Sequence, residues 1–315
     1  MLGHVKRLLA VVVLVSAGAC AGLSQTPDEP SLVFVAMLDL SGRGLLGGVS
    51  GLEVDAAGTT ATAVRDDGLA LEFPLEFDAD GTLVGIGTVR AAPIGGVPLG
   101  APKSLSDAEV LRREADGSWL VAFEGRHRVA RHAPGWEGLL SEPVLLDLPP
   151  EVADLPVNKG IESVAVAPDG TIVIIAETTG PDGLNPAWIG RNGTWAARRY
   201  RTEPEFQPTD ALFLPNGDLL VLERAFSILR GFRCRLSRVP AEEVASSEVW
   251  EGRFLGRVHP PEPASEDNFE GLALLPPDGD RIRLLAISDD NFSPLQRTLL
   301  LQFDLLPPAA PATGG

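Results

Sequence analysis

The sequence predicts an all-β protein, a β-propeller that we expect to have six blades, and three observations carry this prediction. Gly (34) and Pro (27) are plentiful among the 315 residues and aromatic residues make up only 6%, a balance that favours short strands and tight turns. Apolar strands recur in pairs around turns in which Gly usually follows Asp or Asn. The first acids of these pairs, at positions 53, 109, 162, 210 and 270, are 48 to 60 residues apart, a little above the usual propeller period.

The N-terminus predicts an export signal over residues 1–20. Two basic residues precede the stretch "LLAVVVLVSAGAC", which is too short for a comfortable membrane span. Small residues before Cys20 resemble a bacterial lipobox, so we expect lipidation of Cys20, with ordinary cleavage near Ala19 or Ala21 as the alternative. The protein would then be exported, either to the periplasm or as a membrane-anchored lipoprotein of a bacterial envelope, and the lipid would be its only membrane attachment.

A polar linker over residues 21–31 precedes the propeller domain, which we place at residues 32–306. The stretch "LVFVAMLDL" predicts a first strand and "RTLLLQFDL" a last one, and we expect the two to share a blade. Five units of paired strands lie between them, at residues 50–68, 107–125, 160–178, 208–226 and 268–291. The long intervals leave room for two more strands per unit and for a sixth blade. A β-solenoid or a pair of sandwiches is the alternative, and residues 307–315 read as a disordered tail.

The charge balance argues against nucleic acid as a partner. The chain has 43 acidic and 26 basic residues, a formal net charge of -17, which would repel a phosphate backbone. An acidic surface can collect divalent cations, or it can simply keep an exported protein soluble. If Cys20 carries lipid, the remaining Cys234 has no disulfide partner, and its strand context predicts a thiol in the core. We expect a monomer.

The acids that open the units are the candidate site. In a propeller the innermost strand of each blade begins at the mouth of the central channel, so residues at matching positions converge there. The first acids are Glu53, Glu109, Glu162, Asp210 and Glu270. The second acids, at the ends of the next strands, are Asp66, Asp67, Glu124, Glu177, Glu223, Asp289 and Asp290. Several carboxylates without His or Cys favour Ca²⁺, or else Mg²⁺. Taken singly, each acid could equally cap a turn or pair with a surface base.

Basic residues near these acids suggest an anionic substrate. Lys159 precedes Glu162 and Arg224 follows Glu223, and a base beside a bound cation would hold a phosphate or carboxylate. Neutralisation of the neighbouring acid is the alternative. The stretch "GGVSGLE" lacks the second glycine of a nucleophile elbow, and phosphate-binding loops are missing.

The motifs "NFEGLALLPPDG", followed by "LLAISDDNF", "GIESVAVAPDG" and "DALFLPNGDLLVLERAF", resemble the bacterial secreted proteins of the family called esterase-like activity of phytase, over residues 32–305. The resemblance implies a propeller outside the cytoplasm that hydrolyses phosphate or carboxylic esters. It carries over onto the five first acids and, in the second strands, onto Glu124, Glu223, Arg224, Asp289, Asp290 and Asn291. Two departures are an Arg before the paired acids of the first unit and Asp210 in place of Glu.

The leading hypothesis is a calcium-assisted hydrolase of small anionic phosphoesters. Its expected catalytic residues are Lys159, Glu162, Arg224 and Glu270. Its expected metal ligands are Glu53, Glu109, Glu162, Asp210, Glu270, Asp289 and Asp290, with Asp66, Glu124, Glu177, Glu223 and Asn291 as secondary candidates. A non-catalytic, calcium-stabilised binding propeller and a metal-dependent lactonase or carboxylesterase are the alternatives.

Overall fold

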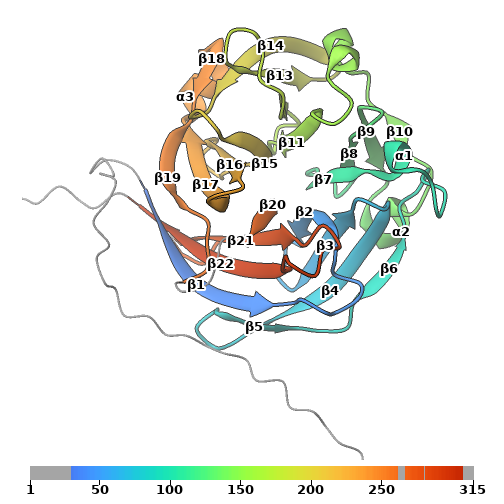
Figure 1. The fold of residues 1–315 in the computed structure, drawn as a ribbon, viewed down its shortest axis with the longest axis vertical. Coiled ribbons are helices and arrows are strands. Elements are labelled where there is room, and N and C mark those ends of the chain that lie inside the picture. Colours follow the sequence, from blue (N-terminus) through green and yellow to red (C-terminus); the bar gives the residue numbers. More distant parts are fainter. Residues whose placement is uncertain (1–29, 262–266, 280, 308–315) are drawn as a thin grey trace, which may run out of the picture.

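A computed structural model describes residues 30–261, 267–279 and 281–307, and it shows five sheets arranged around a central axis (Figure 1). The protein is therefore a five-bladed β-propeller, and the expected sixth blade is wrong. The five units recognised in the sequence are the five blades. The long intervals between them supply the outer strands and loops of those same blades, which leaves no strands for another sheet in the described parts of the chain.

Each blade begins with its innermost strand. Blade 1 contains β2 (Val49–Val54), β3 (Thr60–Arg65), β4 (Leu69–Phe77), β5 (Leu83–Ile86) and β6 (Arg90–Pro93). Blade 2 contains β7 (Ala108–Arg113), β8 (Trp119–Phe123), β9 (Arg128–His132) and β10 (Val144–Leu145). Blade 3 contains β11 (Ile161–Val166), β12 (Ile172–Ala176), β13 (Asn185–Arg191), β14 (Thr194–Arg201) and β18 (Val249–Glu251). Blade 4 contains β15 (Gln207–Phe213), β16 (Leu219–Ser227), β17 (Gly231–Val239) and β19 (Arg253–Arg257).

Blade 5 closes the ring and confirms the shared blade. It contains β20 (Asn268–Leu274), β21 (Ile282–Asp289), β22 (Leu299–Leu306) and, as its outermost strand, β1 (Ser31–Asp39). Strand β1 pairs antiparallel with β22 along its length, from Ser31 opposite Leu306 to Asp39 opposite Leu299. Because the two ends of the described chain are hydrogen-bonded in one sheet, opening the ring would break that whole pairing.

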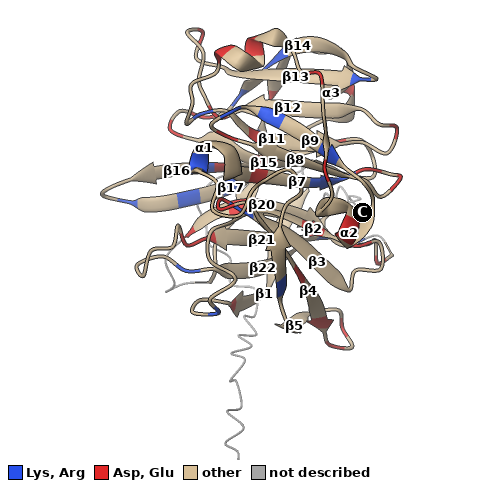
Figure 2. Cartoon of the chain, turned by 90° about the vertical axis from the view of Figure 1, so that its right-hand side faces the viewer, with Lys and Arg blue, Asp and Glu red and all other residues tan. Residues whose placement is uncertain are grey.

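Short helices lie in the loops between strands: α1 (Lys103–Ser106), α2 (Gly135–Leu139), α3 (Ala241–Ser246) and a 3-10 turn at Pro150–Asp154. The turns between the first two strands of each blade place Gly at positive φ, for example 84° at Gly170 and 88° at Gly217, as the hairpin signals predicted. Seen from the side, β16 and β17 form a hairpin that projects from one end of the propeller (Figure 2).

The core lies between the facing surfaces of neighbouring blades. Between blades 5 and 1, for example, Leu52 and Phe73 pack in one cluster with Ile287 and Leu300, all of them buried. Cys234 is buried in the cluster between blades 4 and 5, which confirms the predicted core thiol. Stability thus depends on each blade being covered on both faces by its neighbours.

In the parts of the chain that the structure describes, no helix has the length and apolarity needed to cross a bilayer. The predicted signal and Cys20 lie outside the described residues, as do most of the predicted tail and nearly all of the linker.

Candidate active site at the acidic mouth of the channel

Every innermost strand carries a β-bulge near its start, and these bulges define the site. In β7 the pairing with β8 passes from Ala108 opposite Phe123 to Val110 opposite Ala122, so Glu109 has no partner. The same irregularity occurs in β2, β11, β15 and β20. The unpaired residues are Ser50, Glu109, Glu162, Thr209 and Glu270. A bulge re-aims a side chain, and here five equivalent side chains are placed around one end of the channel.

A second set of equivalent residues stands directly beside the bulges. In the innermost strand of each blade, one residue forms the last pair before the bulge, and the residue of this set comes directly after its partner in the second strand. In blade 2, for example, Ala108 pairs with Phe123 just before the bulge, and Glu124 follows Phe123. The set is Asp66, Glu124, Glu177, Arg224 and Asp289. We call these residues and the five bulge residues together the acidic mouth. It contains seven carboxyl groups and a single base, Arg224.

Three carboxyl groups approach most closely at blade 2. Oxygen atoms of Asp107, Glu109 and Glu124 all lie within 4.8 Å of one another, and Asp107 and Glu124 are buried. The backbone N–H of Gly160 donates to Glu124 Oε1 at 3.3 Å. Burial raises the pKa of Glu124, although the hydrogen bond from the N–H of Gly160 opposes this shift.

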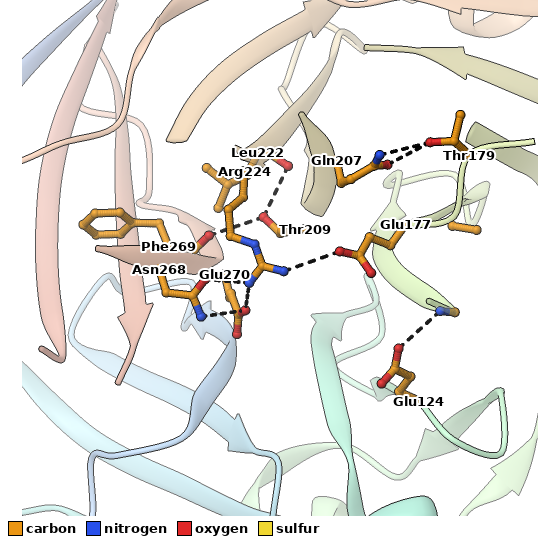
Figure 3. Close-up of polar contacts among 12 residues, drawn as sticks. Glu124, Glu177, Thr179, Gln207, Thr209, Leu222, Arg224, Asn268, Phe269 and Glu270 are labelled. Atoms are coloured by element: carbon orange, nitrogen blue, oxygen red, sulfur yellow. Dashed lines mark hydrogen bonds and ion pairs between the residues drawn. The ribbon is translucent and has the colours of Figure 1, made fainter. Parts of the chain in front are cut away.

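Arg224 joins the carboxylates of blades 3 and 5 (Figure 3). Its Nη1 donates to Glu270 and, at 2.6 Å, to Asn268 Oδ1, while Nη2 lies 3.5 Å from Glu177 Oε1. Asn268 also donates to Glu270 Oε1 at 2.8 Å. The Glu270 carboxylate is therefore held in one orientation by two donors, which is how a ligand or a catalytic group is positioned.

Hydroxyl groups occupy the two bulge positions without an acid. The Ser50 Oγ–H donates to Asp66 Oδ1 at 2.8 Å, and the Thr209 hydroxyl lies 3.3 Å from the carbonyl oxygen of Phe269. At the edge of the mouth, Lys103 Nζ lies 3.2 Å from Asp107 and 3.7 Å from Asp66.

Burial and repulsion between carboxylates raise the pKa values of three acids in the mouth, Glu109, Glu162 and Asp289, and of Asp107 beside it. Burial is the largest cause for Glu109 and Glu162, and neighbouring carboxylates add to it, so both pKa values lie well above the usual range. The pKa of Asp289 is raised to about 8 by burial and by Glu270 and Asp66, and that of Asp107 to about 6 by burial despite Lys103. Ionising these groups together therefore costs free energy, and added positive charge would lower that cost.

The chemistry of these donors fits a hard divalent cation. Oxygen donors that are held by the backbone, converge on one opening and lack His or Cys are the ligands of Ca²⁺ and Mg²⁺. The close oxygens of Asp107, Glu109 and Glu124 are where the described residues come nearest to a ligand set.

The prediction that five first acids share one position is wrong for Glu53 and Asp210. Glu53 lies three residues beyond the bulge residue Ser50, and Asp210 lies one beyond Thr209. Both instead contact Arg112 in the channel: Asp210 forms a buried ion pair with its Nη2, and Glu53 Oε1 lies 3.6 Å from its Nη1. Burial raises the pKa of Glu53 to about 7 and that of Asp210 to about 6, and Arg112 opposes both shifts.

Arg112 links all five innermost strands at the axis. Its guanidinium donates to the carbonyl oxygens of Leu52 (3.3 Å), Leu111 (2.6 Å), Val164 (2.8 Å) and Ala211 (2.8 Å). Asp210 adds the fifth blade, because its Oδ2 accepts from the backbone N–H of Leu272 at 2.8 Å. We call Arg112 and Asp210 together the axial pair. The role of Asp210 in this pair is structural, because it connects Arg112 to the innermost strand of blade 5.

Other predicted residues also lie apart from the mouth. Glu223 is fully buried and accepts from Tyr200 (2.8 Å), Arg235 (2.5 Å) and Ser237 (2.6 Å). Asp67 pairs with Arg65 at 2.7 Å.

In the β21–β22 loop, Asp290 accepts from the N–H groups of Gly48 (3.1 Å) and Phe292 (3.0 Å), and Asn291 adopts positive φ. Lys159 is exposed on the loop that leads into β11. None of these observations assigns Asp290, Asn291 or Lys159 to the acidic mouth.

Sequence reasoning missed Asp107, Ser50, Thr209 and Asn268. The turn glycine offers a signal that would have aligned the bulges. Ser50, Glu109, Glu162 and Thr209 each stand eight residues before the glycine of their turn, and Glu270 stands nine before its own.

The fold and the site define a five-bladed β-propeller with a buried, acidic mouth at one end of its channel. The chain belongs to the phytase-like family described as esterase-like activity of phytase, whose model matches residues 45–292. No curated protein matches the sequence significantly.

Solved structures with a similar fold have distant sequences. An α-L-arabinofuranosidase from Podospora anserina, solved with cellotriose, is 12% identical with a TM-score of 0.50, covering 90% of this chain and 98% of its own. A protein of unknown function from Dyadobacter fermentans is 12% identical with a TM-score of 0.44, covering 88% and 98%. A putative gluconolactonase is 14% identical with a TM-score of 0.42, covering 90% and 97%. At these identities the likeness concerns the fold alone.

Proposed function

We propose that the acidic mouth binds divalent cations, with Ca²⁺ preferred over Mg²⁺, and that the protein hydrolyses phosphoesters of small anionic substrates there. The observation that carries the proposal is the convergence of Glu109, Glu162 and Glu270 from three blades. Seven buried or half-buried carboxyl groups held around one opening are costly in a protein that only needs to fold. Membership of a family named for phytase and esterase-like activity supports hydrolysis.

A bound cation would supply a water of lowered pKa and positive charge for the phosphoryl oxygens. The protein's own residues would do the rest. Arg224 is held at the opening by Glu270 and Glu177, so its guanidinium can hold a phosphoryl oxygen. The pKa of Glu162 lies well above the usual range because of burial and of the carboxylates of Glu177 and Glu124, so Glu162 can pass a proton to a leaving alcohol oxygen. Exposed Lys159 would attract the anionic substrate.

The proposal includes export, with Cys20 lipidated or the signal cleaved. The competing function is a calcium-stabilised binding propeller without catalysis, and one observation favours it: Arg224 is already engaged by two carboxylates.

Calcium binding and turnover can be tested separately on the purified protein. Melting is followed with chelator and with increasing calcium, and hydrolysis is measured with p-nitrophenyl phosphate, a p-nitrophenyl acyl ester, phytate and a lactone. Calcium at a hundred times its dissociation constant should stabilise the protein by about 2.7 kcal/mol. Turnover of a phosphate ester that chelator abolishes supports the proposal. Turnover of only the acyl ester or the lactone would redirect it to carboxylic esters, and silence on all four with a calcium response would indicate binding alone.

Glu109→Gln and Glu53→Gln form a matched pair. Both remove one carboxylate charge from an innermost strand, but only Glu109 lies in the mouth. We expect Glu109→Gln to weaken calcium binding by about tenfold or more, the loss of one charged ligand, and Glu53→Gln to leave it unchanged. Equal calcium affinity in the two variants would remove the mouth from cation binding.

A further inference from the structure

The end of the channel opposite the acidic mouth contains a cavity of about 540 Å³, which is within the size range of small-molecule sites. Five innermost strands surround the axis of the propeller, one from each blade (Figure 1). Each begins near the mouth, and its last residue lines the cavity: Val54, Arg113, Val166, Phe213 and Leu274. All five blades therefore contribute to this space, which we call the axial cavity.

The axial pair lies between the axial cavity and the acidic mouth. Blade 1 shows the order along the channel. Ser50 is the bulge residue at the mouth, the carbonyl oxygen of Leu52 accepts from Arg112, and Glu53 and Val54 line the cavity. The residues of the acidic mouth, all of them in the described part of the chain, line no part of the axial cavity. The cavity is therefore a second, separate place for a ligand.

The wall of the axial cavity is mostly apolar. Val166, Phe213 and Leu274 are only half-buried, although each ends a strand in which the preceding residues are buried. Val54 and Leu212 extend this apolar surface. An apolar group that enters the cavity would remove the surface from water, which favours binding.

Two charged side chains that line the axial cavity are fully engaged by other groups. All three nitrogen atoms of the Arg112 guanidinium donate to carbonyl oxygens or to Asp210, and each Nη atom has two acceptors. Arg112 therefore has no donor left for a ligand. Glu114 accepts from Arg131 at 2.6 and 2.9 Å.

Arg113 and Asp116, at the end of β7 and in the turn that follows it, also have partners. The Arg113 guanidinium lies over the Trp119 ring, 5.4 Å from its centroid. Asp116 accepts from the backbone N–H of Ser118 at 2.9 Å. The charge of Arg113 affects the pKa of Glu53 less than burial, Arg112 or Asp210 do, so Arg113 is not the counter-ion of Glu53.

Glu53 is the charged group of the axial cavity that keeps most of its capacity to accept hydrogen bonds. Its Oε1 lies 3.6 Å from Arg112 Nη1, an ion pair that is too long for a hydrogen bond. The backbone N–H of Arg113 also favours the ionised form, yet burial raises the pKa of Glu53 to about 7. The carboxylate lacks the positive charge that would offset its burial, and 18% of the side chain stays accessible.

We propose that the axial cavity binds a small organic cation, a primary amine on an apolar chain, whose ammonium group donates to Glu53. The ammonium group supplies one positive charge and three N–H donors, and the apolar chain contacts Val166, Phe213 and Leu274. The cation lies beside the axial pair, on the side away from the acidic mouth.

Two other kinds of ligand fit the axial cavity less well. An anion would need a donor, but Arg112 has none left and Arg113 is stacked on Trp119. A metal ion such as Ca²⁺ takes about six to eight oxygen ligands, whereas Glu53 is a single carboxylate among apolar neighbours.

Calorimetric titration of the purified protein with ligands of equal chain length tests the charge that the cavity selects. Hexylamine, hexanol and hexanoate are compared in chelator at about pH 8.5, above the pKa of Glu53 and below that of an alkylammonium group. We expect one hexylamine per chain, hexanol at least about tenfold weaker, and no binding of hexanoate. From methylamine to hexylamine, affinity should rise by about fourfold for each methylene that leaves water.

Two variants with the same change in charge locate the amine. Glu53→Gln removes the carboxylate of the axial cavity, and Glu109→Gln removes one from the acidic mouth. We expect Glu53→Gln to weaken hexylamine binding by about tenfold or more and Glu109→Gln to keep it. Melting curves establish that both variants remain folded.

Four results would overturn the proposal. They are no binding of hexylamine, binding of hexanoate or hexanol as tight as that of hexylamine, equal affinity for methylamine and hexylamine, and equal loss in the two variants. The last result would place the amine among the carboxylates of the mouth. Because the titration contains neither calcium nor an ester, its outcome is independent of cation binding and catalysis at the mouth.

Discussion

Asp289→Asn tests whether the mouth holds more negative charge than the folded chain tolerates by itself. Burial, Glu270 and Asp66 raise the pKa of Asp289 from 3.8 to about 8. The folded state therefore binds this proton more tightly than the unfolded state does. The contribution of Asp289 to stability is complete below about pH 4 and is lost as the pH rises through about 8.

The shift spans about four pKa units, and each unit is worth about 1.4 kcal/mol, so the cost of ionising Asp289 in the folded protein is at most about 6 kcal/mol. In chelator, the melting temperature of the unaltered protein should fall between pH 4 and pH 9. A loss of this size corresponds to roughly 10 °C in a domain of this length. Asp289→Asn should remove much of that fall, because asparagine has no proton to lose.

Circular dichroism melting from pH 4 to pH 9, with chelator and then with calcium, measures the effect. Asp169→Asn is the matched control, because Asp169 is exposed in a turn and its pKa is lowered by the N–H and hydroxyl of Thr171. Calcium should flatten the fall in the unaltered protein by compensating the ionised carboxylates. Parallel pH profiles for Asp289→Asn and Asp169→Asn in chelator would refute the reasoning.

Three further predictions concern groups outside the mouth. Arg112→Met should lower the free energy of unfolding in urea by about 3–5 kcal/mol, because Asp210 would be left buried and unpaired; a loss below about 1 kcal/mol would contradict the role of the axial pair. Tyr200→Phe should cost about 1–3 kcal/mol in the same assay through the lost hydrogen bond to Glu223, and no change would show that Glu223 is satisfied without it. Cys234, whose pKa burial raises to about 12, should react with a thiol reagent only after unfolding, and rapid labelling of the native protein would contradict its burial.

The sequence was sufficient for the strands and for the ring because the signals are local. Turn glycines mark each hairpin, and apolar strands at both ends predicted the pairing of β1 with β22. The number of blades, in contrast, is not set by any local signal in the sequence. The intervals between units are long enough for two strands, yet outer strands such as β10, with two residues, and β18, which joins blade 3 after blade 4 has begun, follow no period.

Only part of the site was predicted, because the repeats were aligned by placing the acid of one unit opposite the acid of the next. This rule found Glu109, Glu162 and Glu270, but it also accepted Glu53 and Asp210, which lie beyond the bulge in their strands. A shift of one residue turns a side chain to the opposite face of a strand, so counting from the turn glycine is needed to separate the mouth from the axial pair. The partners of Arg112 come from blades 1 to 4, and Asp210 adds blade 5 through Leu272, so this network could not be inferred from any single segment.

The bulges have a consequence for how this fold can acquire new specificities. Each blade offers the opening one side chain that is excluded from ladder hydrogen bonds, so it can be exchanged without disturbing the sheet behind it. Ser50 and Thr209 already show that a hydroxyl is accepted where three blades supply glutamate. The number of charges at the opening can therefore change by single substitutions while the scaffold stays constant.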